Sequence, residues 1–153
     1  MALSTDLVGS TRPGASLLVS RSRLRFFAKA TGQQDPVYVD VEAARRAGHR
    51  DLPVPPTFFF SVDLEVPDSF GYLVDLGVDL RTVLHGEQEF VYSELAYAGD
   101  ELTTSSTIVD VYEKKGGALQ FLVTEIPVTN QHGRTIATMR NTLVVRQLSG
   151  VRA

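Results

Sequence analysis

The sequence contains no cysteine. This absence excludes disulfide bonds, thiol nucleophiles and cysteine-ligated metal sites, and it leaves the redox compartment open. The three histidines do not have the spacing of a metal-binding motif. We therefore expect no metal, and nothing in the sequence implies a cofactor.

A strongly basic charge and long apolar runs are missing as well. The net charge is −3, so the sequence does not predict the clustered basic surface of a nucleic-acid-binding protein. Apolar runs such as PTFFFSV are far too short to span a bilayer, and the first residues lack the apolar core of a signal peptide. We expect a cytoplasmic protein that binds neither nucleic acid nor a membrane.

What remains is the composition of an ordinary globular protein. Of the 153 residues, 43% are hydrophobic and 22% are charged, which is typical of a chain that buries its own core. We expect a single domain over residues 1–153, with its core at about residues 17–146.

The first half of the sequence predicts helices. Ser20 is a suitable N-cap for a helix that ends at Gly32, and Asp40 is a suitable N-cap for a shorter helix that ends at Gly48. The proline-rich DLPVPPT predicts a stiff, extended connection after the second helix. The apolar residues that follow Thr57 predict a short buried helix.

The second half predicts strands. Residues 101–117, 118–133 and 134–148 are rich in β-branched residues and end in turn signals, which predicts an antiparallel meander. The preceding TVLHGEQEFVYS also has strand character, although Gly86 interrupts it. Because such a sheet has one face to bury, we expect an apolar helix to cover it. The predicted fold class is α+β, with a long helix packed against a curved antiparallel sheet.

Three segments then point to a family: FAKATG at residues 27–32, AARRAGHRDLPVPPTF at 43–58 and YAGDEL at 97–102. Together with Pro36 and Asp40, their order and spacing resemble those of the MaoC-like hot-dog proteins. That family contains (R)-specific enoyl-CoA hydratases and 3-hydroxyacyl-thioester dehydratases. The resemblance implies a hot-dog fold, a thioester of coenzyme A or acyl-carrier protein as ligand, and a pairing of protomers edge to edge.

The residues that carry catalysis in that family are replaced here. Its motif D-x-N-P-x-H supplies an Asp and a His, but Gln33 stands at the Asp position, Tyr38 at the His position and Asp35 at the Asn position. Glutamine does not exchange protons near neutral pH, and tyrosine, with a pKa of about 10, is a poor base. Positioned acid–base groups contribute about 10²–10⁴-fold to a rate. In this respect the chain resembles the dyad-free subunits of heteromeric hydroxyacyl dehydratases.

This loop has two readings. In the first, Gln33 and Tyr38 form an altered acid–base pair, with Asp35 recruited as the base. In the second, the site is vestigial and Asp35 caps the turn just before Pro36.

The histidines offer a reserve site. On a regular strand His85, Glu87 and Glu89 would share one face, and an imidazole beside a carboxylate is suited to acid–base chemistry. Alternatively, His85 is a polar residue at a strand end or a subunit contact. His49 and His132 fall in polar loops, where we expect them to be exposed.

The resemblance also implies substrate-binding residues. The backbone N–H of Thr57 stands where the family stabilises the thioester oxygen, with Pro55 and Phe58 beside it. Basic residues at a tunnel mouth would hold the phosphates of coenzyme A, or they belong to solvated turns and surfaces; they are Arg146, Arg140, Lys114 and Lys115. Aromatic residues of the segment after Pro56 form either plain core or the wall of an acyl tunnel; they are Phe58, Phe59, Phe60, Phe70 and Tyr72.

Three functions follow from these observations. The first is a subunit that lacks the Asp/His dyad, binds the acyl thioester and pairs with a dyad-bearing MaoC-like partner. The second is a self-sufficient hydratase, dehydratase or thioesterase that uses His85 with Glu87, or Tyr38 with Asp35. The third is a non-catalytic homodimer that binds acyl thioesters.

Overall fold

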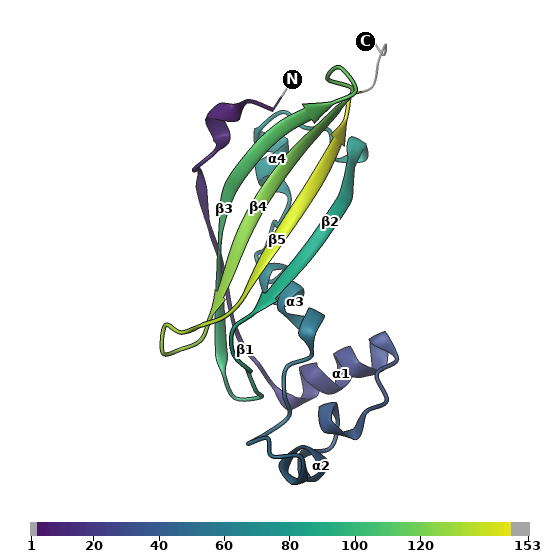
Figure 1. Ribbon diagram of the computed structural model, residues 1–153, viewed down its shortest axis with the longest axis vertical. Helices are drawn as coiled ribbons and strands as arrows, with labels where there is room; N and C mark the ends of the chain where they lie inside the picture. Colours follow the sequence, from purple (N-terminus) through teal and green to yellow (C-terminus); the bar gives the residue numbers. More distant parts are fainter. Residues whose placement is uncertain (1–2, 148–153) are drawn as a thin grey trace.

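A computed structural model describes residues 3–147, and its framework is a five-stranded antiparallel sheet (Figure 1). The strand order is β1-β3-β4-β5-β2. The bounds are β1 Thr11–Leu18, β2 Val83–Tyr92, β3 Glu101–Lys114, β4 Leu119–Thr129 and β5 Thr135–Arg146. The predicted meander of the second half is therefore confirmed; residue 148, which closes its last predicted segment, lies outside the described residues.

Both helices of the first half begin at the predicted residues; α1 also ends at the predicted Gly32, whereas α2 ends at Arg46, two residues before the predicted Gly48. Helix α1, Arg21–Thr31, is capped by Ser20, whose hydroxyl accepts from the Arg23 N–H, and it ends at Gly32 in the left-handed conformation (φ 71°). Helix α2, Val41–Arg46, is capped by Asp40. Both helices extend beyond one end of the sheet (Figure 1). Short 3-10 turns complete the chain; they are η1 Thr5–Leu7, η2 Pro36–Tyr38, η3 Pro56–Phe58 and η4 Leu80–Thr82.

The fold class is confirmed, but the helix against the sheet is not one long helix. After η3, α3 covers only Phe59–Asp63, and α4 covers Gly71–Asp75. Pro67 lies between them; it lacks an N–H and disfavours helical backbone at the residue before it. The buried face of the sheet is thus covered by two short helices with an irregular connection.

Strand β1 has no clear signal in the sequence, because TRPGASLL contains both proline and glycine. It forms against β3 with a register shift between Pro13 and Ser16. At Gly14 a Cβ atom would lie 2.2 Å from Thr104 Oγ1 and 2.4 Å from its carbonyl oxygen, so only glycine allows this approach. Tertiary pairing, rather than local propensity, makes this segment a strand.

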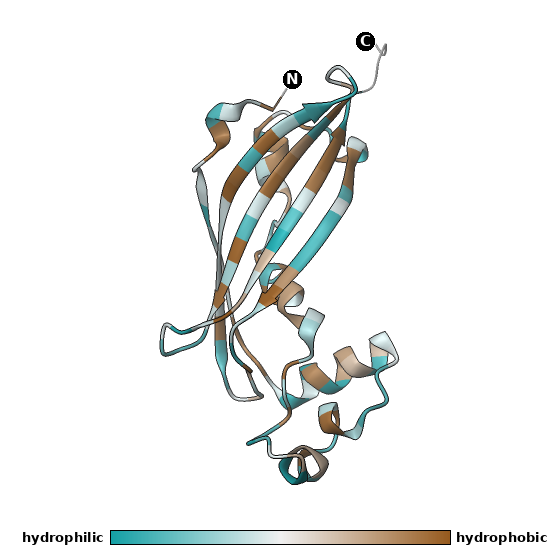
Figure 2. Cartoon of the chain, in the orientation of Figure 1, coloured by the Kyte–Doolittle hydropathy of each residue, from teal (hydrophilic) through white to brown (hydrophobic). Residues whose placement is uncertain are grey.

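Two apolar clusters form the core. The first apolar cluster joins α1, η3 and α3 to the sheet and includes Leu24, Phe58, Phe59, Ile126 and Met139. The second apolar cluster joins α4 to the other end of the sheet and includes Leu73, Ile108, Leu122, Leu143 and Val145. Strands β2 and β5 show hydrophilic residues at mid-length between hydrophobic ends (Figure 2).

No helix within residues 3–147 is both long enough and apolar enough to cross a bilayer.

Candidate functional site

The loop between α1 and α2 uses its polar side chains to fix its own backbone. Gln33 Oε1 accepts a hydrogen bond from the Asp35 N–H at 3.0 Å. Asp35 Oδ1 accepts from the Val37 N–H at 3.0 Å and caps η2, with Pro36 at the first position of the turn. The Tyr38 N–H donates a hydrogen bond to the Asp35 carbonyl oxygen at 3.1 Å, whereas no hydrogen bond joins the two side chains within the described part of the chain. This geometry supports the reading of Asp35 as a cap.

Tyr38 lies at a cavity of about 320 Å³ where this loop meets η3 and the end of β2. The cavity is mostly apolar; its lining includes Val37, Pro53, Val54, Pro56, Phe59, Tyr92, Leu95 and Ala96, together with His49 and Glu94. An apolar hollow with few polar groups is typical of a small-molecule site. We call it the Tyr38 cavity.

Tyr92 fixes one wall of the Tyr38 cavity. Its hydroxyl donates a hydrogen bond of 3.0 Å to the carbonyl oxygen of Pro56, and its ring centroid lies 6.1 Å from that of Phe59. Partial burial raises the pKa of Tyr92 above its ordinary value. Our sequence interpretation did not select Tyr92, although EFVYS has the alternation of a strand that could have placed it.

The histidine in the Tyr38 cavity is His49, contrary to the expectation that it is exposed. Its side chain is half-buried, and its Nδ1 lies 3.2 Å from the Tyr97 hydroxyl. The two rings are tilted, with centroids 5.8 Å apart. His49 was assigned to a polar loop because the sequence around it is polar, but β-bridge pairing of Pro53 with Tyr97 folds that loop over the cavity. His132 is exposed, as predicted.

His85 and Glu87 do not form a pair. A register shift between them, at Gly86, sets His85 opposite Leu143 and Glu87 opposite Thr142. Consecutive residues of β5 face opposite sides of the sheet, so the two side chains do too. His85 lies at the inner face with edge-on contacts to the rings of Phe60 and Phe70, at 6.1 and 6.2 Å. The proposed His85–Glu87 acid–base pair is therefore wrong.

The residues predicted around the thioester have mixed environments. Pro55 is buried and caps η3 without a side-chain hydrogen bond, and Thr57 is exposed within that turn. Phe58 is buried, and its ring packs edge-on against Phe27 with centroids 5.3 Å apart. Phe58 is thus a core residue that also supports the wall of the Tyr38 cavity through its neighbour Phe59.

Arg146 is not part of this site. It is exposed at the end of β5 opposite Leu119, and the β3–β4 turn with Lys114 and Lys115 lies at the same end of the sheet. Helices α1 and α2 lie beyond the opposite end (Figure 1). Within this chain, the basic residues of these segments therefore lie at the end of the sheet away from the Tyr38 cavity, and a role of Arg146 in binding the phosphates of coenzyme A stays a prediction.

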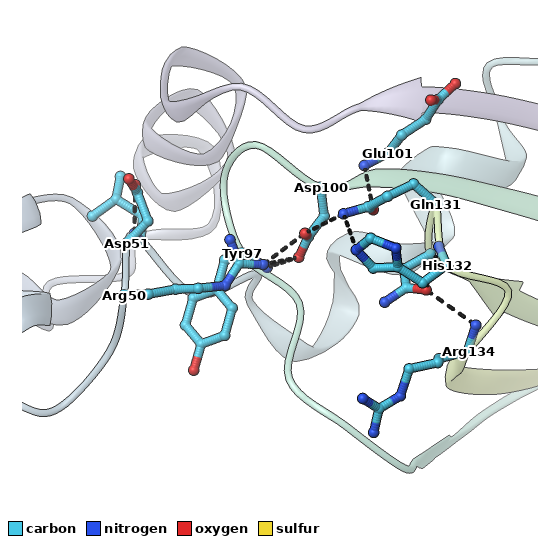
Figure 3. Close-up of polar contacts among 10 residues, drawn as sticks. Arg50, Asp51, Tyr97, Asp100, Glu101, Gln131, His132 and Arg134 are labelled. Carbon is cyan, nitrogen blue, oxygen red and sulfur yellow. Dashed lines mark hydrogen bonds and ion pairs between the residues drawn. The ribbon is translucent and has the colours of Figure 1, made fainter.

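A buried carboxylate holds the neighbouring loops together (Figure 3). Asp100 is 3% exposed and accepts hydrogen bonds from Arg50 Nη2 at 2.6 Å, from the Tyr97 N–H at 2.8 Å and from Gln131 Nε2 at 3.1 Å. Burial opposes its ionisation, but hydrogen bonds from Gln131, Tyr97 and Arg50 together hold the pKa of Asp100 below its ordinary value. The Asp of the YAGDEL segment is therefore a structural anchor.

No cluster of three or more metal-ligating side chains occurs among the residues that the structure describes. The Tyr38 cavity is a mostly apolar hollow whose polar lining consists of two tyrosines, Tyr38 and Tyr92, with His49 and Glu94. This lining is suited to the binding of an apolar group.

Comparison with known proteins gives a consistent assignment. The family model for the FAS1-like, dehydratase domain region matches residues 6–139. A UPF0336 protein of Streptomyces coelicolor is 38% identical over 147 residues, which cover 95% of this chain and 97% of that protein. A UPF0336 protein of Clavibacter michiganensis is 37% identical with the same coverage.

Solved structures show the same fold. One is the HadBC (3R-hydroxyacyl-ACP dehydratase) complex of Mycobacterium tuberculosis, with 26% identity, a TM-score of 0.77 and coverage of 92% of this chain and 99% of that one. Another is the ChsH1–ChsH2 complex of the same organism, with 21% identity, a TM-score of 0.76 and coverage of 93% and 92%. A MaoC-like dehydratase of Rhodospirillum rubrum has 20% identity, a TM-score of 0.68 and 94% coverage of both chains. The chain therefore belongs to the FAS1-like dehydratase-region family and has the hot-dog fold of the MaoC-like dehydratases.

Proposed function

We propose that this chain is the acyl-thioester-binding subunit of a cytoplasmic enoyl-thioester hydratase or 3-hydroxyacyl-thioester dehydratase, and that a dyad-bearing partner supplies the acid and the base. One observation carries the proposal. In the loop where the family has its dyad, the Gln33 and Asp35 side chains accept hydrogen bonds from the backbone, and of the three replaced positions Tyr38 is the one that lines the cavity.

The chemistry explains why a partner is needed. Hydration of an enoyl thioester requires a base that takes a proton from water and an acid that protonates the α-carbon. A glutamine supplies neither group, and a phenol with an ordinary pKa of about 10 is protonated at neutral pH. The two alternative acid–base pairs, Tyr38 with Asp35 and His85 with Glu87, are not assembled. Asp35 caps η2, and a bulge separates His85 from Glu87.

The surface around the Tyr38 cavity supports a protein partner. Strand β2 is an edge of the sheet, and among residues 3–147 it pairs with β5 alone. Exposed apolar residues lie along it and just after it; they are Leu84, Val91, Tyr92 and Leu95. An open strand edge with apolar neighbours is a surface that a second sheet can cover. Two of the similar solved structures are two-protein complexes.

Reconstitution tests this proposal. The chain is co-expressed with a dyad-bearing MaoC-like subunit from the same genome, and the complex is isolated by size exclusion. We expect the complex to hydrate crotonyl-CoA faster than the partner alone. The proposal fails if the two proteins do not associate, or if the chain leaves the partner's rate and substrate range unchanged.

A second candidate function, a self-sufficient hydratase, rests on His49. An imidazole titrates near neutral pH and can transfer protons, and His49 lies in the Tyr38 cavity. The hydrogen-bond partner of its Nδ1 is the Tyr97 hydroxyl and not a carboxylate. Activity of the pure chain that disappears in His49→Ala and persists in His132→Ala would favour this candidate over the first.

A third candidate, the acyl-thioester-binding homodimer, uses the same cavity and the same open edge of β2. It predicts acyl-CoA binding by the pure chain and no association with a dyad-bearing subunit.

A further inference from the structure

The outer face of the sheet carries a row of apolar side chains near its α4 end. Helices α3 and α4 pack on the inner face, and no helix of residues 3–147 covers the outer face of β3, β4 and β5 (Figure 1). The cross-strand register places four residues of this face side by side; they are Tyr112, Phe121, Val144 and Leu84. The rings of Tyr112 and Phe121 stack with their centroids 4.6 Å apart. We call these four residues the outer ladder.

The burial pattern shows that the outer ladder faces away from the core. Its strand neighbours belong to the second apolar cluster; they are Val111, Leu122 and Leu143. Successive residues of a strand face opposite sides of the sheet, so the outer ladder lies on the side that the cluster does not occupy. Leu84 is 47% exposed, and the other three side chains are half-buried. An apolar row on an open sheet face is a candidate surface for contact with another protein.

The rows on either side of the outer ladder carry opposite charges. Two residues further along the strands toward the β3–β4 turn, the register aligns a basic row; its members are Lys114, Leu119 and Arg146. Two residues in the other direction lies an acidic row; its members are Asp110, Val123, Thr142 and Glu87. The Lys114 Nζ lies 5.0 Å from the ring centroid of Phe121, which places it beside the outer ladder on the same face. The charged residues of both rows are exposed.

These charges distinguish between the two twofold axes that can pair identical sheet faces. A twofold axis parallel to the strands would place each row on the same row of the second copy, so that like charges meet. A twofold axis along the outer ladder reverses the strand direction of the second copy and places its acidic row on the basic row. Lys114 then faces Asp110 of the second copy, and Leu119 faces Val123. The pattern is therefore self-complementary, as an isologous contact requires.

We propose that the outer ladder is an isologous interface between two copies of this chain, with the twofold axis along the ladder. The outer ladder forms the centre of the contact, Leu119 and Val123 extend the apolar area along β4, and Lys114 pairs with Asp110 on each side of the axis. Two sheets that pack face to face in this way keep their strands within about 30° of each other. Because the apolar centre is small, the dimer is weak and its population depends on concentration.

This interface is distinct from the open edge of β2. A partner strand beside β2 lengthens the sheet and leaves its outer face uncovered, so the two contacts are compatible within one assembly. Pairing through the outer face joins two of the proposed heteromers into an assembly with two copies of each subunit. The inference does not depend on acyl binding, because no residue of the outer ladder lines the Tyr38 cavity.

Sedimentation velocity of the full-length chain over a concentration series tests the interface. We expect the weight-average mass of the wild type to rise with concentration. Lys114→Glu sets carboxylates opposite each other and Asp110→Lys sets ammonium groups opposite each other, so each substitution should raise the dimer Kd about tenfold or more. The matched controls are Lys29→Glu and Asp75→Lys, at exposed positions of α1 and α4, which should change the Kd less than about threefold. Equal effects of the two sets overturn the inference, as does a wild type that stays monomeric.

Exchange of the two charges within one chain tests the orientation of the copies. Lys114 and Asp110 lie four residues apart on β3, roughly 13 Å along the strand, which is too far for an ion pair within the chain. Lys114→Glu combined with Asp110→Lys restores opposite charges between copies in the proposed orientation. We expect this double variant, folded by circular dichroism, to recover a Kd within about threefold of the wild type. A double variant that associates no better than the single variants overturns the inference.

Val91→Lys separates the outer face from the edge of β2. A lysine on that edge opposes strand pairing, so the variant should lose any contact through the edge and keep the response to Lys114→Glu. Self-association that Val91→Lys removes and Lys114→Glu leaves intact belongs to the β2 edge, and it overturns the inference.

Discussion

His85 and Glu87 lie on opposite faces of β2, although only one residue separates them. The bulge at Gly86 sets His85 beside Leu143 on the inner face and Glu87 beside Thr142 on the outer face. A histidine and a carboxylate that a regular strand would bring together are thereby kept apart. Loss of this pair leaves the Tyr38 cavity as the site to which a function can be assigned.

The bulge depends on a glycine. A Cβ atom at position 86 would lie 2.8 Å from Val144 Cγ2 and 3.1 Å from the Thr142 carbonyl oxygen. We expect Gly86→Ala to lower the free energy of unfolding by about 1–3 kcal/mol through overpacking. Urea denaturation measures the change, and Gln88→Ala, at an exposed position of the same strand, should cost no more than about 0.5 kcal/mol. Equal effects of the two substitutions would contradict this account.

Asp35 provides a test that separates a cap from a catalytic base. Because asparagine caps a turn about as well as aspartate, Asp35→Asn should retain stability, whereas Asp35→Ala should cost about 1 kcal/mol. If Asp35 were a base, Asp35→Asn would abolish any turnover while leaving the fold unchanged. Thermal unfolding and crotonyl-CoA hydration by the reconstituted complex are measured on both variants, and a stable but inactive Asp35→Asn complex would refute the cap assignment.

Acid sensitivity should depend on two anchored carboxylates. The pKa of Asp51 is lowered to about 2, chiefly by its hydrogen bond from Arg21, and that of Asp100 is also held below its ordinary value. At pH values between the folded and the unfolded pKa of these carboxyl groups, the unfolded chain binds more protons than the folded chain. The stability that the ionised carboxylates contribute is therefore present above about pH 4 and is lost as the pH falls toward 2.

Replacement of Asp100 isolates its share of this effect. We expect Asp100→Asn to be less stable than the wild type near neutral pH and to lose less stability on acidification. Urea midpoints from about pH 6 to pH 2.5 measure the slope, with Asp110→Asn, at an exposed position of β3, as the control. If the urea midpoints of the wild type and of Asp100→Asn fall equally steeply as the pH decreases, Asp100 does not contribute to the acid sensitivity.

We expect the partner subunit to bind at the open edge of β2. Val91 of β2 and Val74 of α4 are almost equally exposed, at 55% and 56%, which makes them a matched pair. A lysine on a strand edge opposes pairing with another sheet, so Val91→Lys should weaken association by about tenfold or more, and Val74→Lys should not. Light scattering after size exclusion measures the assembly, and equal behaviour of the two variants would exclude this edge as the interface.

Local signals in the sequence were sufficient for the helices and the meander. Ser20, Gly32 and Asp40 act over one helical turn, and alternation in residues 101–146 directly reports which face of each strand is buried. The same kind of local argument failed at β1, whose pairing depends on the distant Thr104. The prediction of one long helix failed as well, because an irregular segment that contains Pro67 separates α3 from α4.

The site was less predictable, because it is assembled from segments far apart in the chain. The roles of Gln33 and Asp35 follow from residues two positions away and could be read from the sequence. The position of His49 depends on the bridge from Pro53 to Tyr97, and the separation of His85 from Glu87 depends on a bulge, neither of which a periodic pattern reveals.

The most direct test of the central claim is a pair of measurements on one sample of the pure full-length chain. Hydration of crotonyl-CoA is followed by the loss of enoyl absorbance, and binding of butyryl-CoA is measured by calorimetry. The account predicts binding without turnover, because the Tyr38 cavity is present and the family's acid and base are not. Turnover by the pure chain that disappears in His49→Ala would contradict it and would place the complete active site in this one protein.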